Sequence, residues 1–171
     1  MARFLVKRGD PVWIEDPAYT GAAAAFRNAG ARLVPVPVDG DGFDPAKALR
    51  ACPQPRAVYV TPAHQFPLGM TMSLERRLAL LAAAWRSGAQ VIEDDYAGEF
   101  RFSGRPVPAL RGLDRSGTVI LVGSFNKVLF PSLRLGYLVL PQSLMDRFLA
   151  FRYQADAYPR RTLKLYSATS S

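Results

Sequence analysis

A lysine and an arginine follow one apolar run of the sequence at a spacing that could build a chemical site. Lys127 comes just after the run 118–125, and Arg134 lies seven residues further on. Partial desolvation beside a buried strand lowers the pKa of a lysine, and the neutral amine can form a Schiff base with an aldehyde. A lone lysine in such a place is more often a solvated loop residue. Whether Lys127 is a reactive lysine therefore depends on the other polar residues that accompany it.

The tetrapeptide EDDY at residues 93–96 supplies a carboxylate and a phenol. Since alternate residues of a strand share a face, Asp94 and Tyr96 should point one way and Asp95 the other. A carboxylate beside a phenol suits a heteroaromatic ring that bears a protonated nitrogen and a phenolate oxygen. Glu93 and Asp95 are interpreted as structural acids that face solvent or a helix.

Two further residues suit a phosphate group. Arg134 offers a forked cation and Ser124 a hydroxyl donor, and both groups bind phosphate oxygens. A lysine, an aspartate, a tyrosine and a phosphate clamp are together the groups that hold pyridoxal 5′-phosphate (PLP), whose ring nitrogen pairs with the aspartate. The residues therefore predict a PLP site with Lys127 as its reactive group.

The composition favours a globular protein without a disulfide framework or a metal site. The chain has 171 residues and a net charge of +8, and 49% of its residues are hydrophobic. Cys52 and His64 are the only cysteine and histidine, which leaves little for a zinc site. No apolar run approaches the roughly 20 residues of a membrane span and no signal peptide is visible, so a cytoplasmic protein is expected. The arginines are scattered, which argues against direct nucleic-acid binding by this chain.

Apolar runs that alternate with helical patterns predict how the site residues are positioned. Strands are predicted over 11–16, 31–39, 56–64, 89–96, 118–125 and 133–141, and helices over 19–30, 73–88 and 144–154. This alternation is typical of a parallel sheet with helices on both faces, so a three-layer α/β/α fold with a mostly parallel sheet is expected. Ligands of such sheets bind at the carboxyl ends of the strands, where the polar candidates fall.

Two of these elements carry specific burial predictions. The run 133–141 is interpreted as a buried strand. The helix 73–88 can be capped by Ser73 and should bury one apolar side. That predicted side consists of Leu78, Leu80, Leu81 and Trp85.

Five stretches of the sequence resemble a known family. They are VWIEDPAYTGA, VPVPVDGDGFD, YVTPAHQFPLGMTMSLERRLALL, VIEDDYAGEFRF and GSFNKVLFPSLRLGYLVLP. Together they span most of residues 9–150 and resemble the large domain of fold-type I, class I/II aminotransferases, and more closely the aminotransferase-like domain of MocR-type regulators of the GntR superfamily. The resemblance implies a PLP-dependent transferase fold, with residues 1–159 as a partial large domain and 160–171 as a tail unlike the family.

The resemblance also implies roles for the residues described above. Lys127 would form the internal aldimine with PLP, Asp94 would hold the pyridinium nitrogen, and Tyr96 would hydrogen-bond the ring oxygen O3′. Ser124 and Arg134 would hold the phosphate group.

Four further positions follow from the same resemblance. His64 and Gln65 would border the O3′ side of the ring. Tyr19 would face the substrate, although a packing role for this tyrosine is at least equally consistent with the sequence. Asn126 stands where the family usually has serine or threonine, and its amide can still donate a hydrogen bond to the phosphate.

The first functional hypothesis is a PLP-binding fragment of a MocR-type transcriptional regulator that forms an aldimine with an amino acid or amine effector. The alternative is a fragment of a metabolic class I/II aminotransferase, which transfers an amino group between an amino acid and a 2-oxo acid. A third hypothesis is a nonfunctional gene remnant.

In the family the intact protein is a homodimer and binds DNA through a winged-helix domain, which is not recognisable in this sequence. The chain alone is expected to be poorly soluble and inactive as an enzyme.

The tail LKLYSATSS at residues 163–171 has no apolar period. One possible coding of this tail, read in another frame, encodes a peptide that resembles the family's next helix. A frameshift near residue 160 is therefore hypothesised, and an intact reading frame in the gene beyond this point would contradict it.

Overall fold

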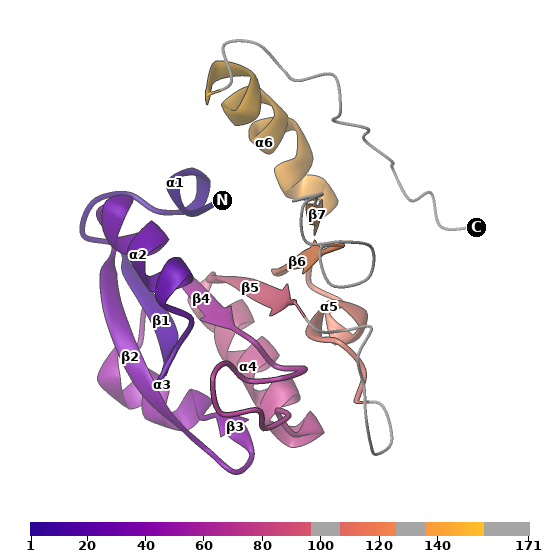
Figure 1. Cartoon of the computed structure of the whole chain (residues 1–171). Coiled ribbons are helices and arrows are strands. Elements are labelled where there is room, and N and C mark those ends of the chain that lie inside the picture. Colours follow the sequence, from indigo (N-terminus) through magenta and orange to yellow (C-terminus); the bar gives the residue numbers. More distant parts are fainter. Residues whose placement is uncertain (97–106, 126–135, 156–171) are drawn as a thin grey trace.

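The computed structural model describes residues 1–96, 107–125 and 136–155, and a β-sheet runs through the middle of this part of the chain (Figure 1). Among these residues the sheet has seven strands in the order β3-β2-β1-β4-β5-β6-β7. The strands are β1 (Pro11–Asp16), β2 (Arg32–Asp39), β3 (Gly42–Phe43), β4 (Ala57–Val60), β5 (Gln90–Asp95), β6 (Val119–Ser124) and β7 (Gly136–Val139). Neighbouring strands from β2 to β6 pair in parallel, whereas β3 and β7 pair antiparallel at the two edges. The predicted, mostly parallel sheet is confirmed.

Helices cover both faces of the sheet. They are α1 (Ala2–Leu5), α2 (Thr20–Asn28), α3 (Pro45–Ala51), α4 (Leu74–Ser87), α5 (Leu110–Leu113) and α6 (Gln142–Ala155). One buried apolar cluster joins α1, α2 and α6 to one face, and a second joins α3, α4 and α5 to the other. Strand β1 feeds both clusters, because Val12 and Ile14 belong to the first and Trp13 to the second. This arrangement confirms the predicted three-layer α/β/α fold.

The burial prediction for α4 is correct for two residues and wrong for two. Leu80 and Leu81 are buried against the sheet, but Leu78 is 50% exposed and Trp85 is 66% exposed. At about 100° per residue, positions 78 and 85 lie on the same stripe of the helix, roughly opposite position 80. None of the helices that the structure describes is long and apolar enough to cross a membrane.

Two strand predictions also need correction. The strand predicted over 56–64 ends at Val60, and the residues that follow form a loop at the carboxyl edge of the sheet. The run 133–141 was expected to be buried, but all four residues of β7 are exposed. The reason is its place in the sheet, because β7 is the edge strand among the described residues and pairs only with β6. Its apolar sequence therefore does not imply burial.

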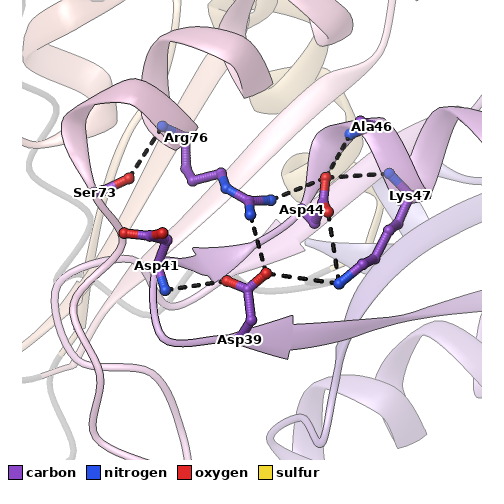
Figure 2. A network of polar contacts seen from close by, with 7 residues as sticks. All are labelled: Asp39, Asp41, Asp44, Ala46, Lys47, Ser73 and Arg76. Carbon is purple, nitrogen blue, oxygen red and sulfur yellow. Dashed lines mark hydrogen bonds and ion pairs between the residues drawn. The ribbon is translucent and has the colours of Figure 1, made fainter.

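A network of charged groups joins the β2–β3 hairpin to the starts of α3 and α4 (Figure 2). Asp44 caps α3, and its Oδ1 lies 2.9 Å from a guanidinium nitrogen of Arg76. The other terminal nitrogen of Arg76 lies 3.0 Å from Asp39 Oδ2. The backbone N–H of Arg76 donates to the capping residue Ser73 at 3.3 Å. Since these side chains are partly exposed, each ion pair should stabilise the fold by at most about 1 kcal/mol.

Candidate functional site

A cavity opens where β1, β4, β5 and β6 reach their carboxyl ends, which is where parallel α/β sheets bind ligands. Its volume of about 390 Å³ falls within the roughly 300–1,000 Å³ that ligand pockets occupy. The described residues that line it are Tyr19, Tyr59, Thr61, Phe66, Asp94, Tyr96 and Ser124.

Asp94 places a carboxylate in this cavity near the end of β5. Its Oδ2 accepts a hydrogen bond from the hydroxyl of Tyr59 on β4. Burial raises the pKa of Asp94, the hydrogen bond from Tyr59 lowers it, and the nearby charge of Asp95 raises it. A carboxylate that has lost part of its hydration gains from a cationic N–H partner, which a protonated ring nitrogen offers.

Aromatic side chains form one side of the cavity. The rings of Tyr19 and Phe66 meet edge to face with their centroids 5.6 Å apart. The ring of Tyr96 lies 6.1 Å from that of Phe66 and 6.1 Å from that of His64. Burial raises the pKa of Tyr96, so its hydroxyl stays protonated at neutral pH and can donate a hydrogen bond. A flat ring that carries polar atoms at its edge matches these surroundings.

A buried carboxylate lies behind the aromatic wall. Glu15, at the end of β1, is 2% exposed. It accepts hydrogen bonds from the backbone N–H of Thr61, from the Thr61 hydroxyl at 2.7 Å and from the side-chain amide of Gln65 at 3.4 Å. The same amide nitrogen donates to the backbone oxygens of Pro17 and Phe66, each at 2.8 Å. This network ties the turn after β1, which leads to Tyr19, to the loop that carries Phe66.

Glu15 should make the stability of the protein depend on pH. Burial raises its pKa from 4.5 to about 7, while the hydrogen bonds from Thr61 and Gln65 lower it. Because the folded state favours the protonated form, this contribution to stability is complete below the unfolded pKa and is lost as pH rises through about 7. We expect the wild-type free energy of unfolding to fall by about 3 kcal/mol more over this range than that of Glu15→Gln. Urea unfolding at pH values from below 4.5 to above about 7 measures the free energy of unfolding of both proteins. An equal change with pH in wild type and Glu15→Gln would contradict the prediction.

On the face of the sheet that α3, α4 and α5 cover, a buried arginine anchors the loops beside the cavity. Arg77 of α4 is fully buried and donates to the backbone oxygens of Met72 at 3.0 Å, Pro108 at 3.1 Å and Pro62 at 2.6 Å. Its guanidinium also lies 3.9 Å from Glu93. Glu93 in turn accepts two backbone hydrogen bonds, both of 2.8 Å, at the start of α5. The interpretation of Glu93 as a structural, helix-facing acid is confirmed.

The structure brings four of the predicted site residues together. Asp94 and Tyr96 lie on the same side of β5 and its extension, as their spacing predicts, and both line the cavity. Ser124, at the end of β6, and Tyr19, after β1, line it as well. These residues come from three different strand ends, and the parallel sheet is what makes them neighbours.

The remaining candidates fall into two groups. His64 lies beside Tyr96 at the margin of the cavity, whereas Gln65 is buried and its amide is occupied by the loop's own hydrogen bonds. Three predicted residues lie outside the part of the chain that the structure describes, namely Lys127, Asn126 and Arg134.

Three lining residues were not found by sequence reasoning. Tyr59 and Thr61 occupy alternate positions in and just after β4, so strand parity could have placed them with the site, but their pairing with β5 was unknown. Phe66 comes from the loop after β4, whose path depends on the network around Glu15. No local pattern predicts such a path.

The family assignment agrees with this geometry. A model of the family described as Aminotransferase class I and II matches residues 1–155. The chain therefore belongs to the class I and II aminotransferase family.

Curated relatives of the chain include transcriptional regulators. The probable rhizopine catabolism regulatory protein MocR of Rhizobium meliloti is 48% identical over 164 residues, which make up 96% of this chain and 33% of MocR. The HTH-type transcriptional regulator TauR of Rhodobacter capsulatus is 39% identical over an alignment of 169 positions, which covers 96% of this chain and 34% of TauR. The chain thus spans about a third of the length of these relatives.

Solved structures of aminotransferases share the fold. LysN, the α-aminoadipate aminotransferase of Thermus thermophilus, was solved in complex with N-(5′-phosphopyridoxyl)-L-leucine. It superposes with a TM-score of 0.82 at 33% sequence identity, over 92% of this chain and 42% of LysN. The partly buried carboxylate of Asp94, the aromatic wall and the hydroxyl groups of the cavity fit the ring and polar edge of PLP, the cofactor that the family implies.

Proposed function

We propose that this chain is the PLP-binding part of a MocR-type transcriptional regulator that responds to an amino acid or amine. The observation that carries the proposal is Asp94, a partly desolvated carboxylate in an aromatic-walled cavity at the carboxyl ends of the strands. The similarity to MocR and TauR along 96% of the chain favours a regulator. DNA binding would come from a winged-helix domain outside this chain, and a second copy of the protein would complete the site in a homodimer.

Each residue of the site has a proposed role. Asp94 would pair with the ring nitrogen, and the hydroxyl of Tyr96 would donate to the ring oxygen O3′. Ser124 and Arg134 would hold the phosphate. Lys127 would supply the amine, since PLP when bound offers a reactive carbonyl carbon that condenses reversibly with primary amines.

The other predicted positions have supporting roles in the proposal. Asn126 would donate an additional hydrogen bond to the phosphate. His64 would border the O3′ side of the ring through its contact with Tyr96. Tyr19 would cover the ring from the side at which the amino compound enters. Gln65 would act at a distance, by holding the loop that carries Phe66.

A metabolic aminotransferase remains the second candidate function, because solved enzymes such as LysN match the fold with a TM-score of 0.82. The two functions differ in turnover. A regulator needs only to bind the amino compound, whereas an aminotransferase must pass its amino group to a 2-oxo acid. Incubation of the complete protein with an amino acid and a 2-oxo acid, followed by chromatography of the products, distinguishes them.

Replacing Asp94 with asparagine should weaken PLP binding by roughly 10-fold, because a charge-assisted hydrogen bond to the ring nitrogen becomes a neutral one. An absorbance titration of the chain with PLP measures the affinity. Asp146→Asn is the control, since Asp146 is an exposed carboxylate on α6 that does not line the cavity. If wild type shows no saturable binding, or if Asp94→Asn binds as tightly as wild type, the proposal fails.

A further inference from the structure

Tyr59 connects the hydrophobic core to the polar floor of the cavity. Its ring is 5% exposed and meets the ring of Phe26 on α2 at a centroid distance of 6.2 Å. This packing fixes the ring, so the hydroxyl at its far end has little freedom. That hydroxyl reaches the cavity and donates to Oδ2 of Asp94.

The surroundings of Asp94 make this hydrogen bond important. Acidic groups lie near Asp94 on two strands, namely Glu15 on β1 and Asp95 on β5. Tyr59 faces it from β4, Tyr96 follows β5, and Ser124 of the neighbouring β6 carries no charge. Burial and the charge of Asp95 favour the protonated form of Asp94, whereas the Tyr59 hydroxyl favours the ionised form.

The two carboxylate oxygens of Asp94 differ in their hydrogen-bond partners. Tyr59 occupies Oδ2, and no donor from the described residues reaches Oδ1. A carboxylate held through one oxygen cannot rotate freely about its terminal bond, so the second oxygen keeps one direction. Such a group is ready to accept an N–H from a ligand in the cavity.

We infer that Tyr59 is a positioning residue, which holds the Asp94 carboxylate ionised and oriented toward a protonated ring nitrogen in the cavity. The inference rests on the proposed PLP site and adds a residue that itself need not touch the ring. It also gives the core a part in ligand binding, because the packing of Tyr59 against α2 determines where the hydroxyl lies.

The inference predicts how Tyr59→Phe changes the pH dependence of PLP binding. Binding needs the ionised carboxylate, so affinity falls as pH drops through the pKa of Asp94. Without the hydroxyl that pKa rises, and the pH at which half of the affinity is lost should move up by roughly one unit. The phenylalanine keeps the ring that packs against Phe26. Tyr153→Phe on the exposed side of α6 removes a hydroxyl that does not line the cavity and should leave the midpoint unchanged.

The measurement is an absorbance titration with PLP at several pH values for wild type, Tyr59→Phe and Tyr153→Phe. An upward shift in Tyr59→Phe alone supports the inference. Saturable binding by both wild type and Tyr59→Phe with the same midpoint overturns it and leaves the proposed function standing. No binding by wild type overturns the proposed function and the inference together.

A second measurement covers the case in which Tyr59→Phe does not fold. In the wild-type chain without PLP, the Tyr59 hydroxyl proton, hydrogen-bonded to the half-buried carboxylate of Asp94, should give a downfield NMR resonance that exchanges slowly with water. Asp94→Ala should abolish this resonance. Its absence from the wild-type spectrum would overturn the inference without any reference to the cofactor.

Discussion

A Lys127→Ala variant is expected to lose the site-specific covalent attachment of PLP while it keeps its fold. Alanine has no amine to condense with the cofactor's carbonyl carbon, so only the noncovalent contacts of the cavity remain. Wild type mixed with PLP should bind it in a form that borohydride reduction makes permanent, and the variant should release it on dialysis. The absorbance of the reduced, dialysed protein measures the fraction that carries the cofactor.

Lys47→Ala is the matched control for this experiment. Lys47 lies on α3, 3.6 Å from both Asp39 and Asp44, and has no contact with the cavity. Lys47→Ala should therefore retain as much reduced cofactor as wild type. Equal retention of reduced cofactor by wild type and Lys127→Ala would contradict the assignment of Lys127.

An Arg77→Met variant is expected to be destabilised by about 3–5 kcal/mol, as is typical when one member of a buried ion pair is removed. Methionine fills a similar volume but donates nothing to the three backbone oxygens that Arg77 binds. It also leaves the buried carboxylate of Glu93 without its nearby cation. Urea unfolding monitored by circular dichroism measures the loss.

The neighbouring residue provides a control on the same helix. Arg76 makes ion pairs with Asp39 and Asp44, but it is partly exposed (Figure 2). Arg76→Met should therefore cost about 1 kcal/mol. Similar losses of stability in both variants would show that the burial of Arg77 does not increase its contribution to the free energy of unfolding.

The layers of the fold could be predicted from the sequence because hydrophobic periodicity reports local structure. The runs 12–14 and 119–122 are apolar throughout, which is typical of strands covered on both faces. The exposure of Trp85 and of β7 could not be predicted in this way. An apolar residue shows that burial would be favourable, but only the assembled layers show whether a covering surface is present.

The site was predictable to the extent that strand parity governs it. The spacing of Asp94 and Tyr96 places both on one side, and their position at a strand end places them at the ligand-binding edge. The contributions of Tyr59 and Gln65 were not predictable. They depend on hydrogen bonds between segments far apart in sequence, such as Tyr59 with Asp94 and Gln65 with Glu15.

Mapping the attachment site of the cofactor on the wild-type chain tests whether Lys127 is the reactive lysine of a PLP site. The protein is incubated with PLP, reduced with borohydride, digested, and its peptides are analysed by mass spectrometry. We predict that the phosphopyridoxyl group is found on Lys127 at close to one per chain. Labelling spread over the four lysines, or none at Lys127, would contradict the account.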